Sequence, residues 1–263
     1  PGMLWLAVLG IIYGALVALA QRDIKRLIAY SSVSHLGYCV LGIFALNRLG
    51  VQGGTLQMIN HGISTGALFA LVGMLYERYH TREISQYSGL AKRLPWLAFF
   101  MLVFTFSSIG LPGMNGFAGE FMILLGVFQM AWGQGAAAEG LQQYRIISVL
   151  AVSGVVLGAW YMLWMIQRVF FGPLREPKTS DETEVKDLNR REVLALTPLA
   201  ILVVWIGVQP AFFLKRMGPS LDRIATPARV TWEDNQMTNR QSPVMNQVSA
   251  NRGAKRETSS RVR

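Results

Sequence analysis

One carboxylate stands alone in a long apolar stretch of this sequence. Between Pro95 and Trp132 the only acidic or basic side chain is Glu120, which follows a glycine- and proline-rich cluster at residues 110–116. An ionisable group inside a membrane segment costs about 2.5–3.5 kcal/mol on insertion scales, so by default it indicates a functional site. A carboxyl group in that setting could take up and release a proton. The alternative is two ordinary helices joined by a Gly/Pro turn, with Glu120 at a wet interface.

Two histidines each lie on a polar stripe of an otherwise apolar segment. The stripes consist of Ser31, Ser34, His35 and Tyr38, and of Gln57, Asn60, His61, Ser64 and Thr65. Spacings of three and four residues place the side chains of each stripe on one helical face. Histidine changes charge near neutral pH and can pass a proton on, while hydroxyl and amide groups can hold the waters between stations. The alternative for either histidine is a structural hydrogen bond between helices.

Other chemistries have weaker support. His35, His61 and Glu120 could hold a metal ion, but neither histidine belongs to a short ligand-spacing motif, so a metal site is the lesser interpretation. The single cysteine, Cys39, excludes an internal disulfide and a Cys-rich metal or iron–sulfur site. The sequence has no dinucleotide-binding glycine fingerprint, phosphate-binding loop or haem-attachment motif. Proton transfer is therefore the chemistry that the residues indicate, and redox chemistry has no obvious site.

Long apolar segments must position these side chains. Charged residues make up 15% of the sequence and hydrophobic residues 52%, whereas soluble domains carry about 25% charged residues. Runs of about 20 apolar residues predict transmembrane helices. The predicted spans are residues 3–20, 26–46, 51–76, 95–132, 144–171 and 193–214. The fold class is therefore all-α, a polytopic transmembrane helix bundle.

The fourth of these spans should be discontinuous. One proline and three glycines within residues 110–116 will not stay in a regular helix. Non-helical backbone at membrane depth is tolerated where it is buried in protein or lines a watery cavity, and broken helices mark such places in ion-coupled transporters. We therefore expect residues 95–132 to form one crossing interrupted at residues 111–117, with Glu120 facing the protein interior.

Loop charges predict the orientation. Lys and Arg gather in the connections at residues 21–25, 77–93 and 168–191, whereas residues 47–50 are nearly bare and residues 133–143 contain none. Short loops rich in Lys and Arg stay on the cytoplasmic side, so the first span should start outside. Within the first of these connections, Asp23 and Lys25 could form a local pair or could both be solvated.

We divide the chain into a transmembrane part, residues 1–215, and a polar basic tail, residues 216–263. The tail lacks helical periodicity, and we expect it to be disordered. The formal charge of +10 is better explained by basic loops and a basic tail on a membrane protein than by nucleic-acid binding. The sequence enters its first span directly after Pro1 without a signal peptide, and we expect it to be part of a longer protein.

Four stretches resemble the antiporter-like, proton-translocating subunits of respiratory complex I, the NADH:quinone oxidoreductase. Residues 23–37 (DIKRLIAYSSVSHLG) resemble the signature of subunits L, M and N, which are similar to subunits of multisubunit Na+/H+ antiporters. Residues 58–62 (MINHG), 75–82 (LYERYHTR) and 119–124 (GEFMIL) resemble subunit M, called chain 4 in mitochondria. Glu120 discriminates among the three, because L and N typically carry Lys there. The resemblance covers about residues 2–213.

This resemblance implies a fold of fourteen transmembrane helices built from two inverted five-helix repeats, of which the chain covers the last six. His35 and His61 match the central proton-relay histidines of the family. Glu120 matches the terminal acidic residue of the relay, near the connection to the outside. The family's other essential groups, a Glu and two Lys, lie upstream of this sequence, and Lys25 at the membrane boundary is not one of them.

The function implied is that of a membrane subunit relaying protons, coupled to NADH oxidation and quinone reduction on partner subunits. NAD, FMN, iron–sulfur clusters and quinone would be held by those partners, with no cofactor or metal on this chain. The partners implied are other membrane subunits, especially L and N, and the lipid bilayer of a bacterial or mitochondrial inner membrane. Two alternatives are a D-type component of a multisubunit Na+/H+ antiporter and a scaffold whose polar stripes serve only helix packing.

Overall fold

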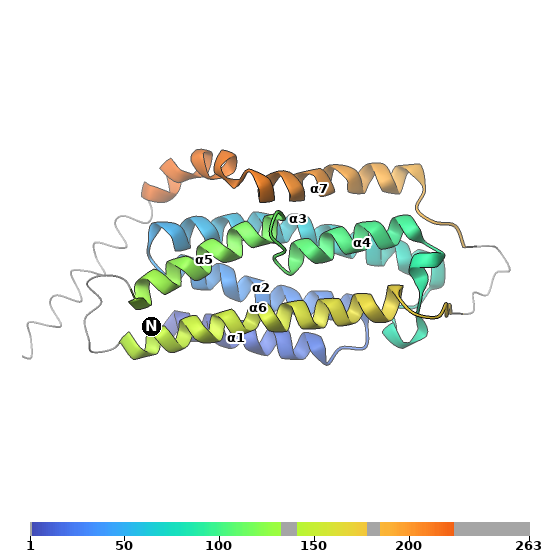
Figure 1. The fold of residues 1–263 in the computed structure, drawn as a ribbon, viewed down its shortest axis with the longest axis horizontal. Coiled ribbons are helices and arrows are strands. Elements are labelled where there is room, and N and C mark those ends of the chain that lie inside the picture. Colours follow the sequence, from blue (N-terminus) through green and yellow to red (C-terminus); the bar gives the residue numbers. More distant parts are fainter. Residues whose placement is uncertain (1, 133–140, 178–184, 224–263) are drawn as a thin grey trace, which may run out of the picture. The chain divides into compact units, whose positions relative to one another are not determined.

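Long helices run side by side in the computed structural model, which describes residues 2–132, 141–177 and 185–223 (Figure 1). The named helices are α1 (Gly2–Leu19), α2 (Ile24–Phe44), α3 (Arg48–Tyr79), α4 (Pro95–Ser108), α5 (Asn115–Trp132), α6 (Leu141–Phe170) and α7 (Arg190–Val208), with short 3-10 helices at Ile84–Gln86 and Leu90–Lys92. Among the described residues, α1, α2, α3, α6 and α7 are long and apolar enough to cross a membrane. The all-α polytopic fold class is confirmed.

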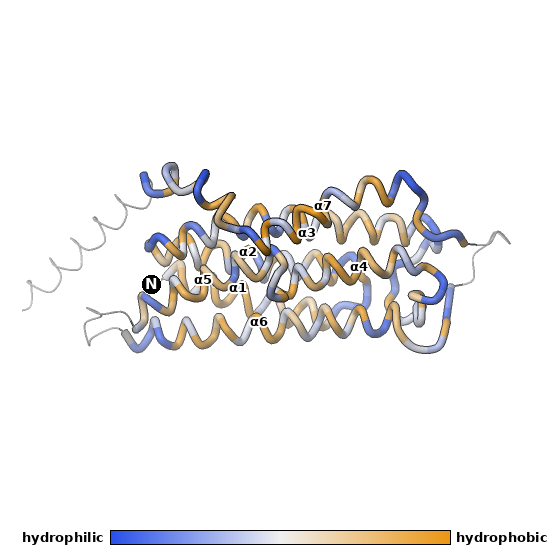
Figure 2. The backbone as a smooth tube through the Cα atoms, turned by 45° about the horizontal axis from the view of Figure 1, so that its top comes forward, coloured by the Kyte–Doolittle hydropathy of each residue, from blue (hydrophilic) through white to orange (hydrophobic). Residues whose placement is uncertain are grey.

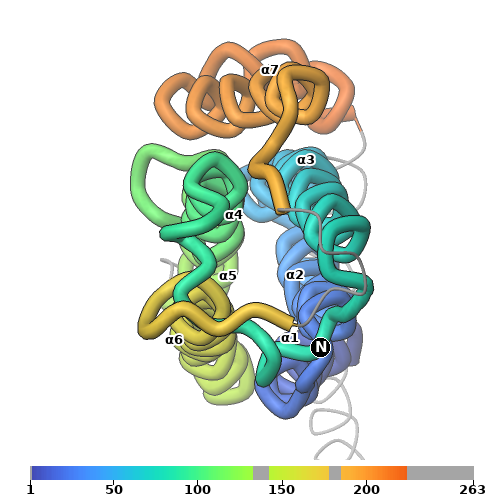
Figure 3. The backbone as a smooth tube through the Cα atoms, turned by 90° about the vertical axis from the view of Figure 1, so that its right-hand side faces the viewer, coloured from blue at the N-terminus to red at the C-terminus, as the bar shows by residue number. Residues whose placement is uncertain are grey.

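The seven named α-helices of the described residues belong to one compact unit, Pro1–Pro219. Seen end-on, α1, α2 and α3 form one row, while α6, α5 and α4 form a facing row, and α7 lies across α3 and α4 (Figure 3). Hydrophilic residues gather at the helix ends and connections (Figure 2). Each helix therefore presents its sides to neighbours or to lipid, as expected of a membrane bundle.

Two larger apolar clusters occupy different lengths of the bundle, and a small third cluster joins α3, α5 and α7. One large cluster contains Leu27 and Ile28 from the first half of α2, and apolar residues from the second halves of α3 and α6. The other takes Leu41 from the second half of α2 together with the first halves of α1 and α6, and with α5. On α2 the polar side chain of His35 lies between the two larger clusters. The polar site is thus enclosed by apolar packing at both ends.

The predicted break in residues 95–132 is confirmed. The chain leaves α4 after Ser108, passes through residues 109–114 without helical structure, and begins α5 at Asn115. Gly110 and Gly113 have φ angles of 71° and 92°, in the left-handed region that favours glycine. The expected interval, residues 111–117, starts and ends too late. Asn115 is the first residue of α5, and its Oδ1 accepts a hydrogen bond from the Gly116 backbone N–H at 2.9 Å.

The three connections rich in Lys and Arg meet at one end of the bundle. Backbone hydrogen bonds join Ile24 N to the Arg82 carbonyl at 3.0 Å and Ile84 N to the Arg22 carbonyl at 2.8 Å. The third connection joins them through Ser88, which pairs with Arg175. This grouping agrees with the loop-charge pattern, and the side of the membrane on which it lies remains a prediction.

Asp23 has a structural role at this end. Its carboxylate accepts a hydrogen bond from the Arg26 backbone N–H at 3.0 Å, which caps α2. The same carboxylate lies 3.4 Å from Arg82 Nε. Asp23 therefore pairs across to the connection after α3, and the local pair with Lys25 that the sequence allowed is not the contact formed.

Helical structure continues beyond α7. Residues 210–219 are helical in the first unit, and the described residues of the second unit, 220–223, are helical as well. Irregular chain was expected from residue 216, and this expectation is wrong for residues 216–223. Residues 224–263, the rest of the predicted tail, lie outside the described part of the chain, as do residues 133–140 of the connection free of Lys and Arg. The division at residues 215/216 stays a prediction.

Candidate proton-transfer site

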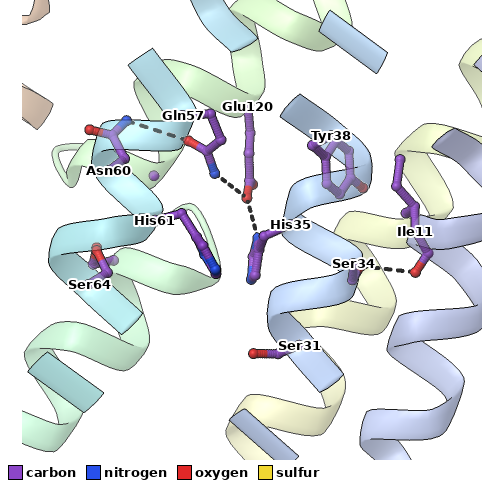
Figure 4. Close-up of polar contacts among 12 residues, drawn as sticks. Ile11, Ser31, Ser34, His35, Tyr38, Gln57, Asn60, His61, Ser64 and Glu120 are labelled. Carbon is purple, nitrogen blue, oxygen red and sulfur yellow. Dashed lines mark hydrogen bonds and ion pairs between the residues drawn. The ribbon is translucent and has the colours of Figure 1, made fainter. Parts of the chain in front are cut away.

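Glu120 lies in the second turn of α5 and points into the protein between α2 and α3 (Figure 4). It is 5% exposed. Its Oε1 accepts a hydrogen bond from Gln57 Nε2 at 3.1 Å and lies 3.2 Å from His35 Nδ1. The prediction that this carboxyl faces the interior is confirmed. A buried carboxylate needs such partners, because an unpaired buried charge is strongly unfavourable.

The two histidines of the polar stripes approach each other across α2 and α3, as predicted. Their ring centroids are 5.2 Å apart and the ring planes are inclined by 36°. His35, near the middle of α2, is 6% exposed, whereas His61 is partly exposed and lies 3.0 Å from Thr65 Oγ1 through its Nδ1. The predicted bridging waters stay a prediction.

His35 has unused hydrogen-bonding capacity. Its Nδ1 is within ion-pair distance of Glu120 but is not aligned with it as a hydrogen bond, and its buried Nε2 has no hydrogen-bond partner among the described residues. Buried polar groups are normally satisfied, and exceptions call for an explanation such as a catalytic role. The histidine is therefore a candidate donor to Glu120.

Two other residues of the α2 stripe form hydrogen bonds between helices, whereas the Ser31 hydroxyl donates to the Ile28 carbonyl of its own helix. Ser34 donates its hydroxyl to the Ile11 carbonyl of α1 at 2.9 Å. Tyr38 donates to the Ala151 carbonyl of α6 at 2.6 Å. The interpretation of the stripe as structural hydrogen bonding thus holds for these two residues, and His35 remains turned toward α3 and α5.

The α3 stripe connects to the helix break. Asn60 Nδ2 donates to the Asn115 carbonyl at 2.7 Å and lies 3.4 Å from Gln57 Oε1. Ser64 contacts the hydroxyl of Ser107 and the side chain of Asn115. A continuous set of hydrogen bonds therefore runs from the start of α5 through α3 to Glu120.

Ser107 and Asn115 are site residues that the sequence analysis did not single out. Both are 0% exposed, and they flank the break on the α4 and α5 sides, where the Ser107 hydroxyl donates to Asn115 Oδ1. The signal available was weak: a small polar residue at each side of a Gly/Pro cluster. Such residues are common as caps, so nothing in the spacing linked them to Glu120.

A close approach between α3 and α5 depends on Gly119. A Cβ atom at this position would overlap Gln57 Oε1 and would lie 3.1 Å from Asn60 Nδ2. Only a residue without a side chain lets the two amides lie against α5 here. Glu120 is the next residue in sequence, so this contact sets its distance from α3.

The site therefore assembles three titratable side chains in the order His61, His35, Glu120, with neutral amides and hydroxyls around them. Among the residues that the structure describes, no group of three or more His, Cys, Asp or Glu side chains is arranged to hold a metal ion. Adjacent titratable groups of this kind can exchange protons.

Comparison with known proteins decides the family. Residues 2–146, which include all three titratable side chains, match the family described as NADH:quinone oxidoreductase/Mrp antiporter, transmembrane. The chain belongs to this family.

Relatives within the family support the resemblance to subunit M. NADH-quinone oxidoreductase subunit M of Rhodobacter capsulatus is 45% identical over 217 residues, which are 82% of this chain and 39% of that protein. Subunit M of Pseudomonas aeruginosa is 44% identical over 210 residues, 80% of this chain and 38% of that protein. NADH-ubiquinone oxidoreductase chain 4 of Chondrus crispus is 40% identical over 217 residues, 82% of this chain and 41% of that protein. The chain thus spans well under half of the length of these relatives.

Solved structures share the fold. A chain of respiratory complex I from Thermus thermophilus with bound NADH superposes with a TM-score of 0.71 at 36% identity, covering 85% of this chain and 44% of that chain. A chain of the Mrp complex from Dietzia sp. DQ12-45-1b also gives 0.71, at 20% identity, covering 85% of this chain and 48% of that chain, which is a likeness of fold alone. The antiporter-like fold and a multi-pass membrane location are therefore established for this chain.

Proposed function

We propose that this chain translocates protons as part of a membrane subunit of an NADH:quinone oxidoreductase, with His61, His35 and Glu120 as successive stations. The observation that carries the proposal is the approach of His35 Nδ1 to Glu120 Oε1 at 3.2 Å. It occurs inside the protein, five residues after the helix restarts at Asn115. The family and the subunit M relatives support the assignment.

The proposed transfer is between neighbours. A protonated His35 facing an ionised Glu120 gives its proton to the carboxylate, so an ion pair becomes a neutral imidazole and a carboxylic acid. No net charge is created in the enclosed site, which matters because unpaired charge there is costly. His61 then re-protonates His35, through ring rotation or one bridging water, since the ring centroids are only 5.2 Å apart.

The helix break has a proposed role in releasing the proton. Residues 109–114 are not held in a helical hydrogen-bond ladder, so the start of α5 can shift relative to α4 more easily than an unbroken helix could. Glu120 lies close to this joint: its Oε2 is the nearest atom to a Cβ built at Gly110, at 2.7 Å. We propose that the carboxyl loses its proton on this side, toward the outer face.

The remaining chemistry is assigned to partners. NADH oxidation and quinone reduction, with NAD, FMN, iron–sulfur clusters and quinone, would take place on other subunits. Subunits L and N are the proposed membrane neighbours, in a bacterial or mitochondrial inner membrane. The names of the relatives and the complex I structure support other membrane subunits as partners.

The antiporter alternative keeps some support. The family description includes Mrp antiporters, and a chain of an Mrp complex shares the fold. A D-type component of a multisubunit Na+/H+ antiporter would use the same three stations to exchange protons for sodium. The identity of 40–45% to subunit M and chain 4 proteins favours the oxidoreductase.

The oxidoreductase subunit and the antiporter component differ in what drives proton transport: NADH oxidation for the first and a sodium gradient for the second. Native membranes containing the full-length protein are tested for a proton gradient driven by NADH and for one driven by a sodium pulse. Our proposal predicts that Glu120→Gln abolishes the NADH-driven gradient and has no effect on sodium-driven exchange. Loss of sodium-driven exchange with a normal NADH-driven gradient would establish the antiporter instead.

A further inference from the structure

We infer that Gln57 is a positioning residue of the relay, whose side-chain amide holds Glu120 Oε1 against His35. The inference rests on the proposed function of Glu120 and deepens it. The Gln57 N–H and the His35 Nδ1 converge on the same carboxylate oxygen, at 3.1 Å and 3.2 Å. Figure 4 shows this convergence, with Gln57 reaching from α3 and His35 from α2.

The orientation of the Gln57 amide is fixed by its neighbours. The two ends of an amide are hard to distinguish by shape, so their assignment needs a hydrogen-bond argument. The backbone carbonyl of Asn115 can only accept, so the Asn60 atom 2.7 Å from it must be the donor Nδ2. That nitrogen also lies 3.4 Å from Gln57, where the facing atom must be the acceptor Oε1. Gln57 is thereby left with its N–H group directed at Glu120.

This arrangement is enclosed. Gln57 is 3% exposed, Asn60 1% and Asn115 0%, so bulk water does not replace the contact. The terminal torsion of a glutamate side chain is broad and not confined to one well. Without the amide, the Glu120 carboxylate is free to turn Oε1 away from His35. Because reaction rate depends steeply on the alignment of the reacting groups, such freedom slows the transfer.

Packing against Gly119 does not by itself account for the hydrogen bond that Gln57 donates. The hydrogen bond that ties the α3 helix to the α5 backbone is made by Asn60. The hydrogen bonds of Gln57 go instead to two side chains, Glu120 and Asn60. Helix packing alone does not require a hydrogen bond to the Glu120 carboxylate oxygen that faces His35.

The test replaces Gln57 by methionine in the full-length protein in native membranes. Met keeps the length and volume of the side chain but has no N–H donor. The matched control is Gln52→Met on the same helix, since Gln52 is also buried at 9% exposure and none of the hydrogen bonds described here joins it to Glu120, His35 or Asn60. In assembled complexes we expect Gln57→Met to slow formation of the NADH-driven proton gradient roughly tenfold, the effect of losing one charge-assisted hydrogen bond. Gln52→Met should be unchanged.

Difference infrared spectroscopy measures a property of Glu120 that would not change if Gln57 served only helix packing. The C=O stretch of protonated Glu120 is identified as the band that disappears in Glu120→Gln. Loss of the Gln57 donor should shift this band in Gln57→Met, because the hydrogen bonding of the carboxyl group changes, and leave it in place in Gln52→Met. A band that stays in place in Gln57→Met overturns the inference, even when the rate falls.

The remaining outcomes are also decisive. Wild-type gradient formation in assembled Gln57→Met overturns the positioning role. When Gln57→Met does not assemble, Gln57→Asn replaces it: the amide is retained but falls one methylene short, so a partial loss is expected and a wild-type rate overturns the role. Glu120→Gln in the same assay separates the two proposals. If the Glu120→Gln variant pumps at the wild-type rate, both the relay and the positioning role of Gln57 are wrong. If Glu120→Gln is inactive and Gln57→Met pumps at the wild-type rate, only the positioning role is wrong.

Discussion

His35 Nδ1 of α2 lies 3.2 Å from Glu120 Oε1 of α5, in the space between the two larger apolar clusters of the bundle. The two residues are held in different ways. His35 belongs to a continuous helix packed against α1 and α3, whereas Glu120 follows a break and is held by Gln57 of α3. The proposed relay therefore combines a station on a continuous helix with one whose position depends on the local structure of α5.

The three histidines of the chain form a natural comparison. His35→Asn and His61→Asn remove a titratable ring from the relay, and each should reduce NADH-driven proton translocation by about 100-fold or more. His80 is exposed and caps α3 with a φ of 51°, a conformation that Asn also tolerates. His80→Asn should pump normally. The measurement is the rate of gradient formation in assembled complexes, and equal effects at all three positions would refute the relay.

Gly119→Ala should disturb the site through a single methyl group. The added Cβ overlaps Gln57 Oε1, so Gln57 must move, at a cost of roughly 1–3 kcal/mol for overpacking. We expect a several-fold slower gradient and a lower thermal midpoint. Gly10→Ala is the control, because no atom lies within 4 Å of the added Cβ at that position. Indistinguishable behaviour of the two variants would show that the close approach of α5 to α3 is not required.

The Arg78–Glu192 ion pair should contribute more to stability than the Arg82–Asp23 ion pair at the same end of the bundle. The Arg78 guanidinium binds both carboxylate oxygens of Glu192, at 2.7 Å and 3.0 Å, and both side chains are largely buried at 14% and 13% exposure. Arg78→Met should lower the free energy of unfolding by about 1.5–3 kcal/mol. Replacing Arg82 by Met should lower the free energy of unfolding by less than about 1 kcal/mol, because the Arg82 side chain is 41% exposed beside Asp23. Thermal unfolding in detergent compares the two variants, and an equal loss would contradict the assignment.

The helices and the three titratable residues could be predicted because they rest on local signals. Apolar length predicts a span, and the cluster of Pro112 with glycines predicts a break wherever it occurs in a helix. The spacing of the stripes placed His35 and His61 on helical faces, which the structure brings together. Glu120 was detectable as the only charge in a long apolar stretch.

What could not be predicted depends on contacts between helices. The division of the α2 stripe between packing and relay follows from which helix faces each residue: Tyr38 meets α6, whereas His35 meets α5. Asn115 became a site residue because α5 begins at that residue and its carbonyl faces Asn60. Periodicity contains no information about which neighbour lies opposite a given face.

The most direct test of the relay is Glu120→Gln in the full-length protein. Gln keeps the size of the side chain and most of its hydrogen bonding, but it cannot bind and release a proton. Glu120→Asp is the matched control, since it keeps the carboxyl on a shorter arm. After assembly has been checked on a native gel, NADH:quinone turnover and proton-gradient formation are measured in the same membranes. We predict that turnover and gradient fall together in Glu120→Gln and that Glu120→Asp keeps much of both, whereas wild-type rates in an assembled Glu120→Gln complex would contradict the account.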